Sequence, residues 1–150
     1  MNIAYFLRPK KETSFLYEDH SFRRGLEKMR RLGYSAMPVI RRDGGYVGVV
    51  TEGDFLWRVF DSQSLRVPPD RNYESLKIRD ILSNDRIKPV RINVSMEELL
   101  LFAQNQNFIP VLDDTDCFIG IVTRKEIIRY FAAELLNNEN ENHGAALRRA

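Results

Sequence analysis

The sequence repeats itself at an offset of 72 residues, and this repeat constrains the possible fold more than any other feature. The alignment of the two copies needs no gap between residues 32 and 59. The aligned positions are Pro38-Val39 with Pro110-Val111, Gly48 with Gly120, Val50-Thr51 with Val122-Thr123, and Asp54 with Glu126. Such a register does not arise easily by chance, so two copies of one supersecondary unit are predicted.

Each copy has the same order of predicted elements, a short strand, a helix, two strands and a closing helix. Apolar residues at helical spacing predict the first helices, around Phe22 to Leu32 and around Met96 to Ala103. The strands are expected at Phe15–Tyr17, Met37–Ile40 and Tyr46–Val50 in the first copy, and at Lys88–Ile92, Ile109–Leu112 and Phe118–Val122 in the second. Tight polar turns at residues 42–45 and 113–116 make each of the last two strands a hairpin.

Local signals set the ends of the predicted helices. Ser95 followed by Glu98 is a capping box, which starts the helix of the second copy. Gly33 and Asn105 tolerate the left-handed conformation that often ends a helix. These signals favour a mixed α/β (α+β) chain rather than an all-α bundle.

The predicted organisation is repeat one over residues 1–62, a linker over 63–76, repeat two over 77–136, and a polar, frayed tail over 137–150. One copy alone would bury only a thin core, whereas two copies packed together bury much more. We therefore expect a pseudo-twofold intramolecular pair rather than two independent domains.

Composition excludes several classes of protein. With 43% hydrophobic and 29% charged residues, the chain is neither mainly disordered nor collagen-like. No apolar run approaches a membrane span, no signal peptide is recognised, and the single cysteine, Cys117, fits a reducing cytoplasm. The net charge of +2 makes nucleic acid an unlikely partner, and two separated histidines, His20 and His143, predict no metal site.

The two motifs resemble the signature of the cystathionine-β-synthase (CBS) domain. In the first copy it spans residues 33–40 and 48–54, and in the second copy residues 108–111 and 120–126. The resemblance covers about residues 5–136 and is similar to a stand-alone CBS pair, or Bateman module. It implies a regulatory module without catalytic activity of its own, with no cofactor beyond its ligand.

The resemblance also implies the ligand and the assembly. Such pairs commonly bind AMP, ADP, ATP, S-adenosylmethionine or cyclic di-AMP, form homodimers, and signal to a regulated partner whose identity the sequence does not give. The alternative is a structural dimerisation module whose clefts hold no ligand. Both interpretations stay open at this point.

Two threonines carry the chemistry that a nucleotide site needs. Thr51 and Thr123 each stand where a strand passes into a helix, so free N–H groups and the helix dipole favour a phosphate there. The resemblance assigns the ribose hydroxyls to Asp54 and Glu126, and Arg124 with Lys125 would add phosphate contacts. Thr-x-x-Asp and Thr-x-x-Glu are also capping boxes, and both roles are compatible.

CBS pairs build their clefts from both copies, and the resemblance implies the same here. One cleft would combine the strand near Ser14–Leu16 and Ser35-Ala36 with Thr123, Arg124 and Glu126. The other would combine the strand near Lys88–Val90 and Asn107-Phe108 with Thr51 and Asp54. Glu126 departs from the usual Asp and Phe108 from the usual small residue, and the first cleft is the preferred site.

Overall fold

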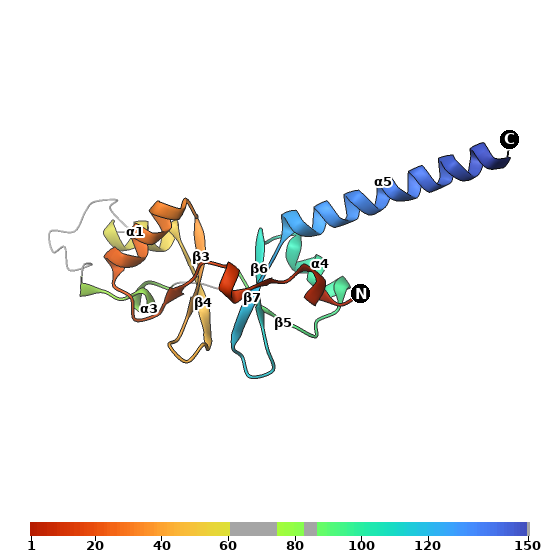
Figure 1. Ribbon diagram of the computed structural model, residues 1–150. Helices are drawn as coiled ribbons and strands as arrows, with labels where there is room; N and C mark the ends of the chain where they lie inside the picture. Colours follow the sequence, from red (N-terminus) through yellow and green to blue (C-terminus); the bar gives the residue numbers. More distant parts are fainter. Residues whose placement is uncertain (61–74, 83–86, 150) are drawn as a thin grey trace.

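The computed structural model describes residues 1–60, 75–82 and 87–149, and it consists of two small sheets with helices on their outer sides (Figure 1). The elements in order are η1 (Ile3–Phe6), β1 (Arg8–Pro9), η2 (Lys10–Glu12), β2 (Leu16–Tyr17), α1 (Phe22–Leu32), β3 (Ala36–Ile40), β4 (Tyr46–Thr51), α2 (Glu52–Val59), α3 (Ile78–Ile81), β5 (Val90–Arg91), α4 (Met96–Ala103), β6 (Phe108–Leu112), β7 (Phe118–Thr123) and α5 (Arg124–Arg149). The mixed α+β fold with two repeats is confirmed. All but two residues of the predicted linker, residues 63–76, lie outside the described residues.

Each sheet contains one predicted hairpin and one short parallel strand. In the first sheet β3 pairs antiparallel with β4 and parallel with β2, with Met37 opposite Val50. In the second sheet β6 pairs with β7 and β5 in the same way, with Ile109 opposite Val122. The equivalent pairs are 72 residues apart, so the repeat in the sequence is a repeat in the register.

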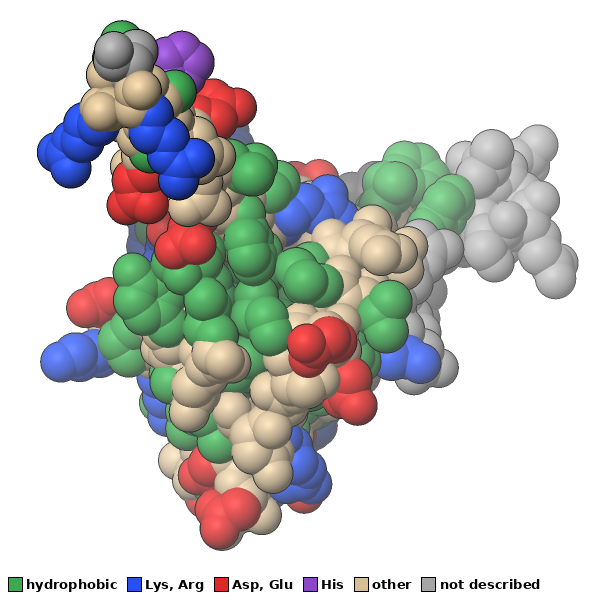
Figure 2. Space-filling view, turned by 90° about the vertical axis from the view of Figure 1, so that its right-hand side faces the viewer, with side chains coloured by type: hydrophobic (Ala, Val, Ile, Leu, Met, Phe, Trp, Pro, Cys, Tyr) green, Lys and Arg blue, Asp and Glu red, His purple; other side chains and the backbone are tan. Residues whose placement is uncertain are grey.

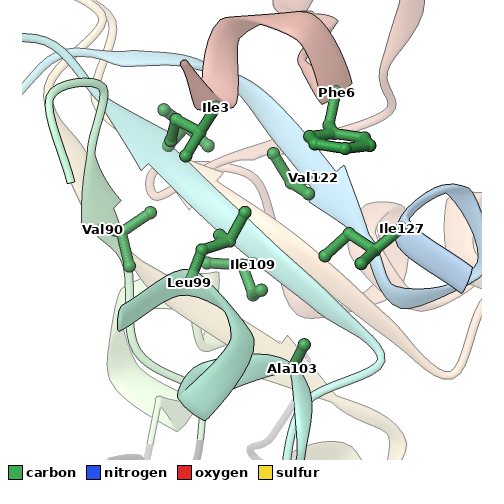
Figure 3. Packing of buried hydrophobic residues seen from close by; sticks show 9 residues of the cluster. Ile3, Phe6, Val90, Leu99, Ala103, Ile109, Val122 and Ile127 are labelled. Carbon is green, nitrogen blue, oxygen red and sulfur yellow. The ribbon is translucent and has the colours of Figure 1, made fainter. Parts of the chain in front are cut away.

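The two halves exchange the segments that precede them. The buried side chains of η1, Ile3 and Phe6, pack into the core of the second half, against Val90, Leu99, Ala103, Ile109, Val122 and Ile127 (Figure 3). β1 extends the same sheet by pairing antiparallel with β7. Conversely, Ile78 and Ile81 of α3 pack into the core of the first half. The predicted repeat boundaries, 1–62 and 77–136, therefore do not coincide with the halves in space.

The sheets of the two halves face each other, as the pseudo-twofold pair requires. Ile40, Leu112 and Phe118 form a third buried cluster between them. The hairpins are also joined by backbone hydrogen bonds, from Tyr46 N to Asp116 O (3.0 Å) and from Phe118 N to Gly44 O (3.0 Å). The two halves therefore share a packed interface. A cleft opens between them at the end of this interface.

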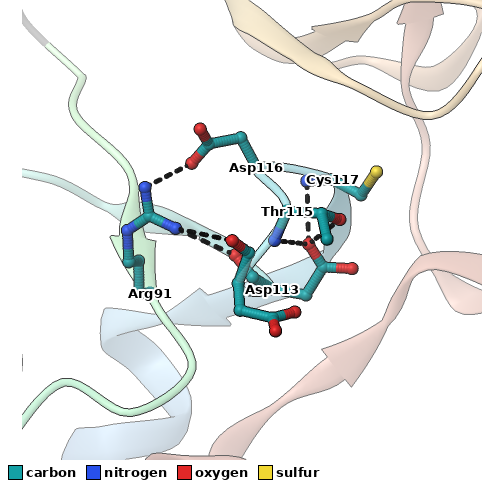
Figure 4. A network of polar contacts seen from close by, with 6 residues as sticks. Arg91, Asp113, Thr115, Asp116 and Cys117 are labelled. Atoms are coloured by element: carbon teal, nitrogen blue, oxygen red, sulfur yellow. Dashed lines mark hydrogen bonds and ion pairs between the residues drawn. The ribbon is translucent and has the colours of Figure 1, made fainter.

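The turn of the second hairpin is held by side chains (Figure 4). Asp113 Oδ1 accepts hydrogen bonds from Thr115 N (2.9 Å), Thr115 Oγ1 (2.7 Å) and Cys117 N (3.0 Å). These bonds, the Thr115 hydroxyl first, lower the pKa of Asp113. Arg91 on β5 pairs with Asp116 at 2.6 Å and ties the turn to the neighbouring strand.

One expectation about a helix end is wrong, the one for Asn105. Gly33 does end α1 in the left-handed conformation (φ 73°), but among the described non-glycine residues only Asp116 has a positive φ. Asn105 therefore does not play the predicted role, because α4 closes instead through bonds from Asn105 N and Gln106 N to Phe102 O. Of the predicted capping box, the structure gives the bond from Glu98 N to Ser95 Oγ (3.1 Å).

The C-terminal tail is the other correction. Residues 137–149 were expected to be frayed, yet they continue α5 to Arg149, away from the two sheets (Figure 1). A helix already begun at Arg124 gains one hydrogen bond per added residue, and no proline interrupts it. Among the described residues no helix is both long and apolar enough to cross a membrane.

His20 makes the stability of the first half dependent on pH. It is buried, and its Nδ1 accepts a hydrogen bond from Tyr17 N (3.4 Å). Burial first, and then the charges of Arg24, Arg42 and Lys28 against that of Asp19, lower the pKa of His20 below 6.5. The unfolded chain therefore binds the proton more readily, so the contribution of His20 to the free energy of unfolding is fully present above pH 6.5 and is lost as the pH drops below it.

Urea unfolding of the wild type and of His20→Gln at about pH 7.5 and about pH 5.5 measures this dependence. The midpoint of the wild type should fall with pH, and that of the variant should change less. If the urea midpoints of the two proteins fell by the same amount between the two pH values, His20 would be excluded as the titrating group.

At Tyr46 a substitution is expected to stabilise the fold. Its hydroxyl is buried between the halves, where the described residues offer it no hydrogen-bond partner, and burial raises its pKa. Removing an unsatisfied buried polar group removes its desolvation cost. Tyr46→Phe should raise the free energy of unfolding by about 1 kcal/mol, and a lower urea midpoint in the variant would contradict this.

Candidate functional site

A cleft of about 160 Å³ opens between the halves at the end of the packed interface. The first half contributes the segment before β2 and the start of β3, and the second half contributes the start of β6 and the end of β7. The lining residues are Arg8, Glu12, Thr13, Ser14, Tyr34, Ala36, Pro38, Phe108, Ile121 and Thr123. Three residues predicted for the first cleft, Ser14, Ala36 and Thr123, lie together here.

The lining of the cleft combines apolar and aromatic residues with polar and charged ones. Pro38 and Ile121 come from the middle of β3 and β7, and Tyr34 and Phe108 add two aromatic rings. Among the polar residues, Thr123 stands where β7 passes into α5. The cleft can therefore take a flat ring between its walls and present the start of a helix to the rest of the molecule.

The two threonines differ in how completely they cap their helices. Thr51 forms a full capping box, because its Oγ1 accepts from Asp54 N (3.3 Å) and Asp54 Oδ2 accepts from Thr51 N (2.8 Å). At Thr123 the bond from Glu126 N to Oγ1 (3.2 Å) is formed, but the Glu126 carboxylate turns to Arg129 (3.1 Å). The buried Asp54 thus acts in the cap of α2.

Arg124 lies outside the cleft, although its position next to Thr123 predicts a place inside it. Its Nε donates to Ala103 O (2.7 Å), so the guanidinium satisfies a carbonyl at the end of α4 rather than lining the cleft. Lys125 is exposed on the first turn of α5. Ser35 also stays outside the lining, with its carbonyl accepting from Glu52 N (3.0 Å), while its neighbours Tyr34 and Ala36 line the cleft.

Four residues predicted for the second cleft, Thr51, Asp54, Asn107 and Phe108, have other places in the described structure, and the first two cap α2. Phe108 lines the first cleft, which corrects its assignment to the second. Asn107 is exposed, and its carbonyl accepts from Arg124 N (2.9 Å). Residues 83–86, just before the strand predicted near Lys88–Val90, lie outside the described residues.

A second, larger hollow adjoins the cleft and was not predicted. This groove, of about 530 Å³, lies between the segment Tyr5–Arg8 and the first turns of α5. Its lining includes Glu126 and Arg129, and it shares Arg8 and Glu12 with the cleft. The sequence contains no signal for Arg8, because nothing in the repeat shows that β1 joins the sheet of the second half. Arg129 follows Glu126 by three residues, and on a helix this spacing brings two side chains of opposite charge together.

The described part of the chain contains no group of three or more His, Cys, Asp or Glu side chains arranged to hold a metal ion. The chemistry available at the site is therefore that of rings, hydroxyls, backbone N–H groups and paired charges. This set is suited to binding and orienting a ligand through its base, sugar and anionic groups.

Comparison with known proteins places both repeats in one family. Residues 9–61 and 78–133 match the CBS domain. A curated relative, the uncharacterized protein MJ1426 of Methanocaldococcus jannaschii, is 26% identical over 144 residues, covering 79% of this chain and 85% of that one.

Solved structures share the fold. CbpB, crystallised in complex with c-di-AMP, superposes with a TM-score of 0.83 at 22% identity, over 94% of this chain and 91% of that one. CbpB from Streptococcus agalactiae gives 0.79 at 23% identity, over 91% and 84%. CBSX2, crystallised in complex with AMP, gives 0.67 at 24% identity, over 91% and 98%. At 22 to 24% identity, the similarity establishes that these proteins share the fold of this chain.

Proposed function

Because this chain belongs to the CBS-domain family, we propose that it is a non-catalytic regulatory module that binds an adenine nucleotide in the cleft lined by Ala36, Phe108 and Thr123. The observation that carries the proposal is the cleft itself, which combines residues of both repeats. Two proteins of the same fold are described in complexes with c-di-AMP and with AMP, which supports an adenine nucleotide as the ligand class.

The size and walls of the cleft suit the base of the nucleotide. A cavity of about 150 Å³ holds one benzene-sized ring, so this open cleft of about 160 Å³ takes part of the two-ring purine base. The rings of Tyr34 and Phe108 offer stacking partners, and the small side chain of Ala36 leaves room beside the strand. The sugar and phosphates then extend beyond the cleft, past Thr123 at the start of α5.

A panel of AMP, ADP, ATP and cyclic di-AMP tested by thermal unfolding checks the proposal. A ligand that binds only the folded state raises the unfolding temperature, and at about 100 times its Kd it adds about 2.7 kcal/mol to the stability. At least one of the four should produce such a shift. No shift from any of them at millimolar concentration would leave the alternative, a structural module that binds no nucleotide.

We also propose that two copies associate through their helical faces. The exposed apolar residues of the second half lie on α4 and the first half of α5, and they include Leu100, Leu101, Ile128, Phe131 and Leu135. Figure 2 shows hydrophobic side chains gathered on the side of the molecule that carries these helices. The first half exposes Leu26, Leu56 and Trp57 on α1 and α2 in the same manner. Unpartnered apolar helix faces of this kind mark interaction surfaces.

Light scattering tests the assembly directly. A homodimer has a mass of twice 17.6 kDa, and a mass of 17.6 kDa would contradict the proposal. In the regulatory role, nucleotide binding would change the shape of this dimer, and a cytoplasmic partner protein would respond to the change. The free thiol of Cys117 agrees with a reducing compartment.

A further inference from the structure

The groove beside the cleft lies where a ligand bound by its base would continue. The cleft and the groove share Arg8 and Glu12, so they form one opening around these two side chains. The groove is the larger of the two, at about 530 Å³ against about 160 Å³. A ligand whose ring occupies the cleft therefore places its remaining atoms toward the groove.

Charged side chains line the groove from three elements. Arg8 comes from β1, Glu12 from η2, and Glu126 and Arg129 from the first two turns of α5. The side chains of Arg129 and Glu126 are 63% and 37% exposed and pair at 3.1 Å. Exposed pairs of this kind are screened by solvent and contribute little, so a stronger anion can replace Glu126 at little cost.

We propose that the ligand carries a phosphate group that lies in this groove between Arg8 and Arg129, and that Glu126 is the internal competitor which the phosphate displaces. The inference rests on the proposed nucleotide function and adds where the phosphate is held and which side chain limits its affinity. Guanidinium groups bind phosphate through paired, charge-assisted hydrogen bonds. A carboxylate that already occupies one guanidinium lowers the affinity for phosphate but leaves that for an uncharged nucleoside nearly unchanged.

The sign of the effect at Glu126 separates this role from the ribose role that the sequence suggests. If Glu126 competes with phosphate, Glu126→Gln frees Arg129, and the affinity for AMP rises about two- to fivefold while that for adenosine is unchanged. If Glu126 binds the ribose hydroxyls, the same substitution weakens AMP and adenosine equally.

Calorimetric titration with adenosine and with AMP tests the proposal in the full chain. The wild type should bind AMP at least about tenfold more tightly than adenosine, since a charge-assisted hydrogen bond contributes about 1.5 to 3 kcal/mol. Arg129→Gln, whose side chain lines the groove but not the cleft, should reduce this ratio toward one without changing the affinity for adenosine. Arg8 lines both hollows, so Arg8→Gln should reduce the affinity for AMP more than that for adenosine. Arg148→Gln, in the last turn of the same helix, is the matched control and should leave both affinities unchanged.

The outcomes are distinct. If neither arginine variant changes the ratio of the affinities for AMP and adenosine, the groove does not hold the phosphate. The same follows if Glu126→Gln weakens both ligands equally. In either case the nucleotide function stands. Binding of none of adenosine, AMP and cyclic di-AMP to the wild type overturns the nucleotide function and the groove assignment together. Urea midpoints of the variants within the error of the wild-type value show that the substitutions leave the fold intact.

Discussion

Gly120→Ala is expected to lower the free energy of unfolding by about 3 kcal/mol, because the added methyl group has no room. Gly120 has φ 153°, a conformation that strains other residues, and a Cβ built there lies 2.1 Å from the carbonyl oxygen of Arg8 and 3.0 Å from its carbonyl carbon. The atoms in the way belong to the backbone of β1, so β1 must leave β7 to make room. The exchange of N-terminal segments between the halves would be lost at this point, and with it the position of Arg8.

Urea unfolding measures the change, and Gly144→Ala is the matched control. Gly144 lies in α5 with no atom within 4 Å of the added Cβ, so this substitution should stabilise the helix by up to about 1 kcal/mol. A Gly120→Ala protein as stable as the control would show that β1 does not pair closely with β7.

Ala36→Phe should reduce the affinity for the nucleotide by about 100-fold, which corresponds to about 3 kcal/mol. The cleft has room for about one ring, and the new phenyl group would occupy the place of the base. Position 36 opens strand β3 and is only half-buried, and aromatic residues are favoured in strands, so the fold should tolerate the change.

Calorimetry with AMP and cyclic di-AMP checks this loss. Ala146→Phe, on the exposed last turns of α5, carries the same substitution away from the cleft and should bind as the wild type does. If Ala36→Phe remained folded and kept its affinity within about threefold, a difference below 1 kcal/mol, the base would not lie in this cleft.

Most of the fold was predictable from the sequence because it rests on patterns that repeat. The 72-residue offset set the register of both hairpins, and Met37 opposite Val50 is matched by Ile109 opposite Val122. The exchange of η1 and α3 between the halves was not predictable. It depends on which core receives Ile3, Phe6 and Ile78, and hydrophobicity alone does not distinguish two cores built from the same unit.

The position of the cleft was predictable from the sequence, but the side-chain contacts around it were not. Strand ends and helix starts follow from the sequence pattern, so Ala36 and Thr123 were placed together correctly. Long charged side chains choose among several partners in space. Arg124 reaches the carbonyl of Ala103, and Glu126 reaches Arg129, and the spacing of the motif contains no information about either choice.

The central claim, that an adenine nucleotide binds between the two repeats, is tested most directly by mapping amide chemical shifts during a titration with AMP and then with cyclic di-AMP. The account predicts that the largest changes cluster at residues 34–36, at Phe108 and at residues 123–126, which come from both repeats but form one cleft. Changes confined to one repeat, or a spectrum that neither ligand alters, would contradict it.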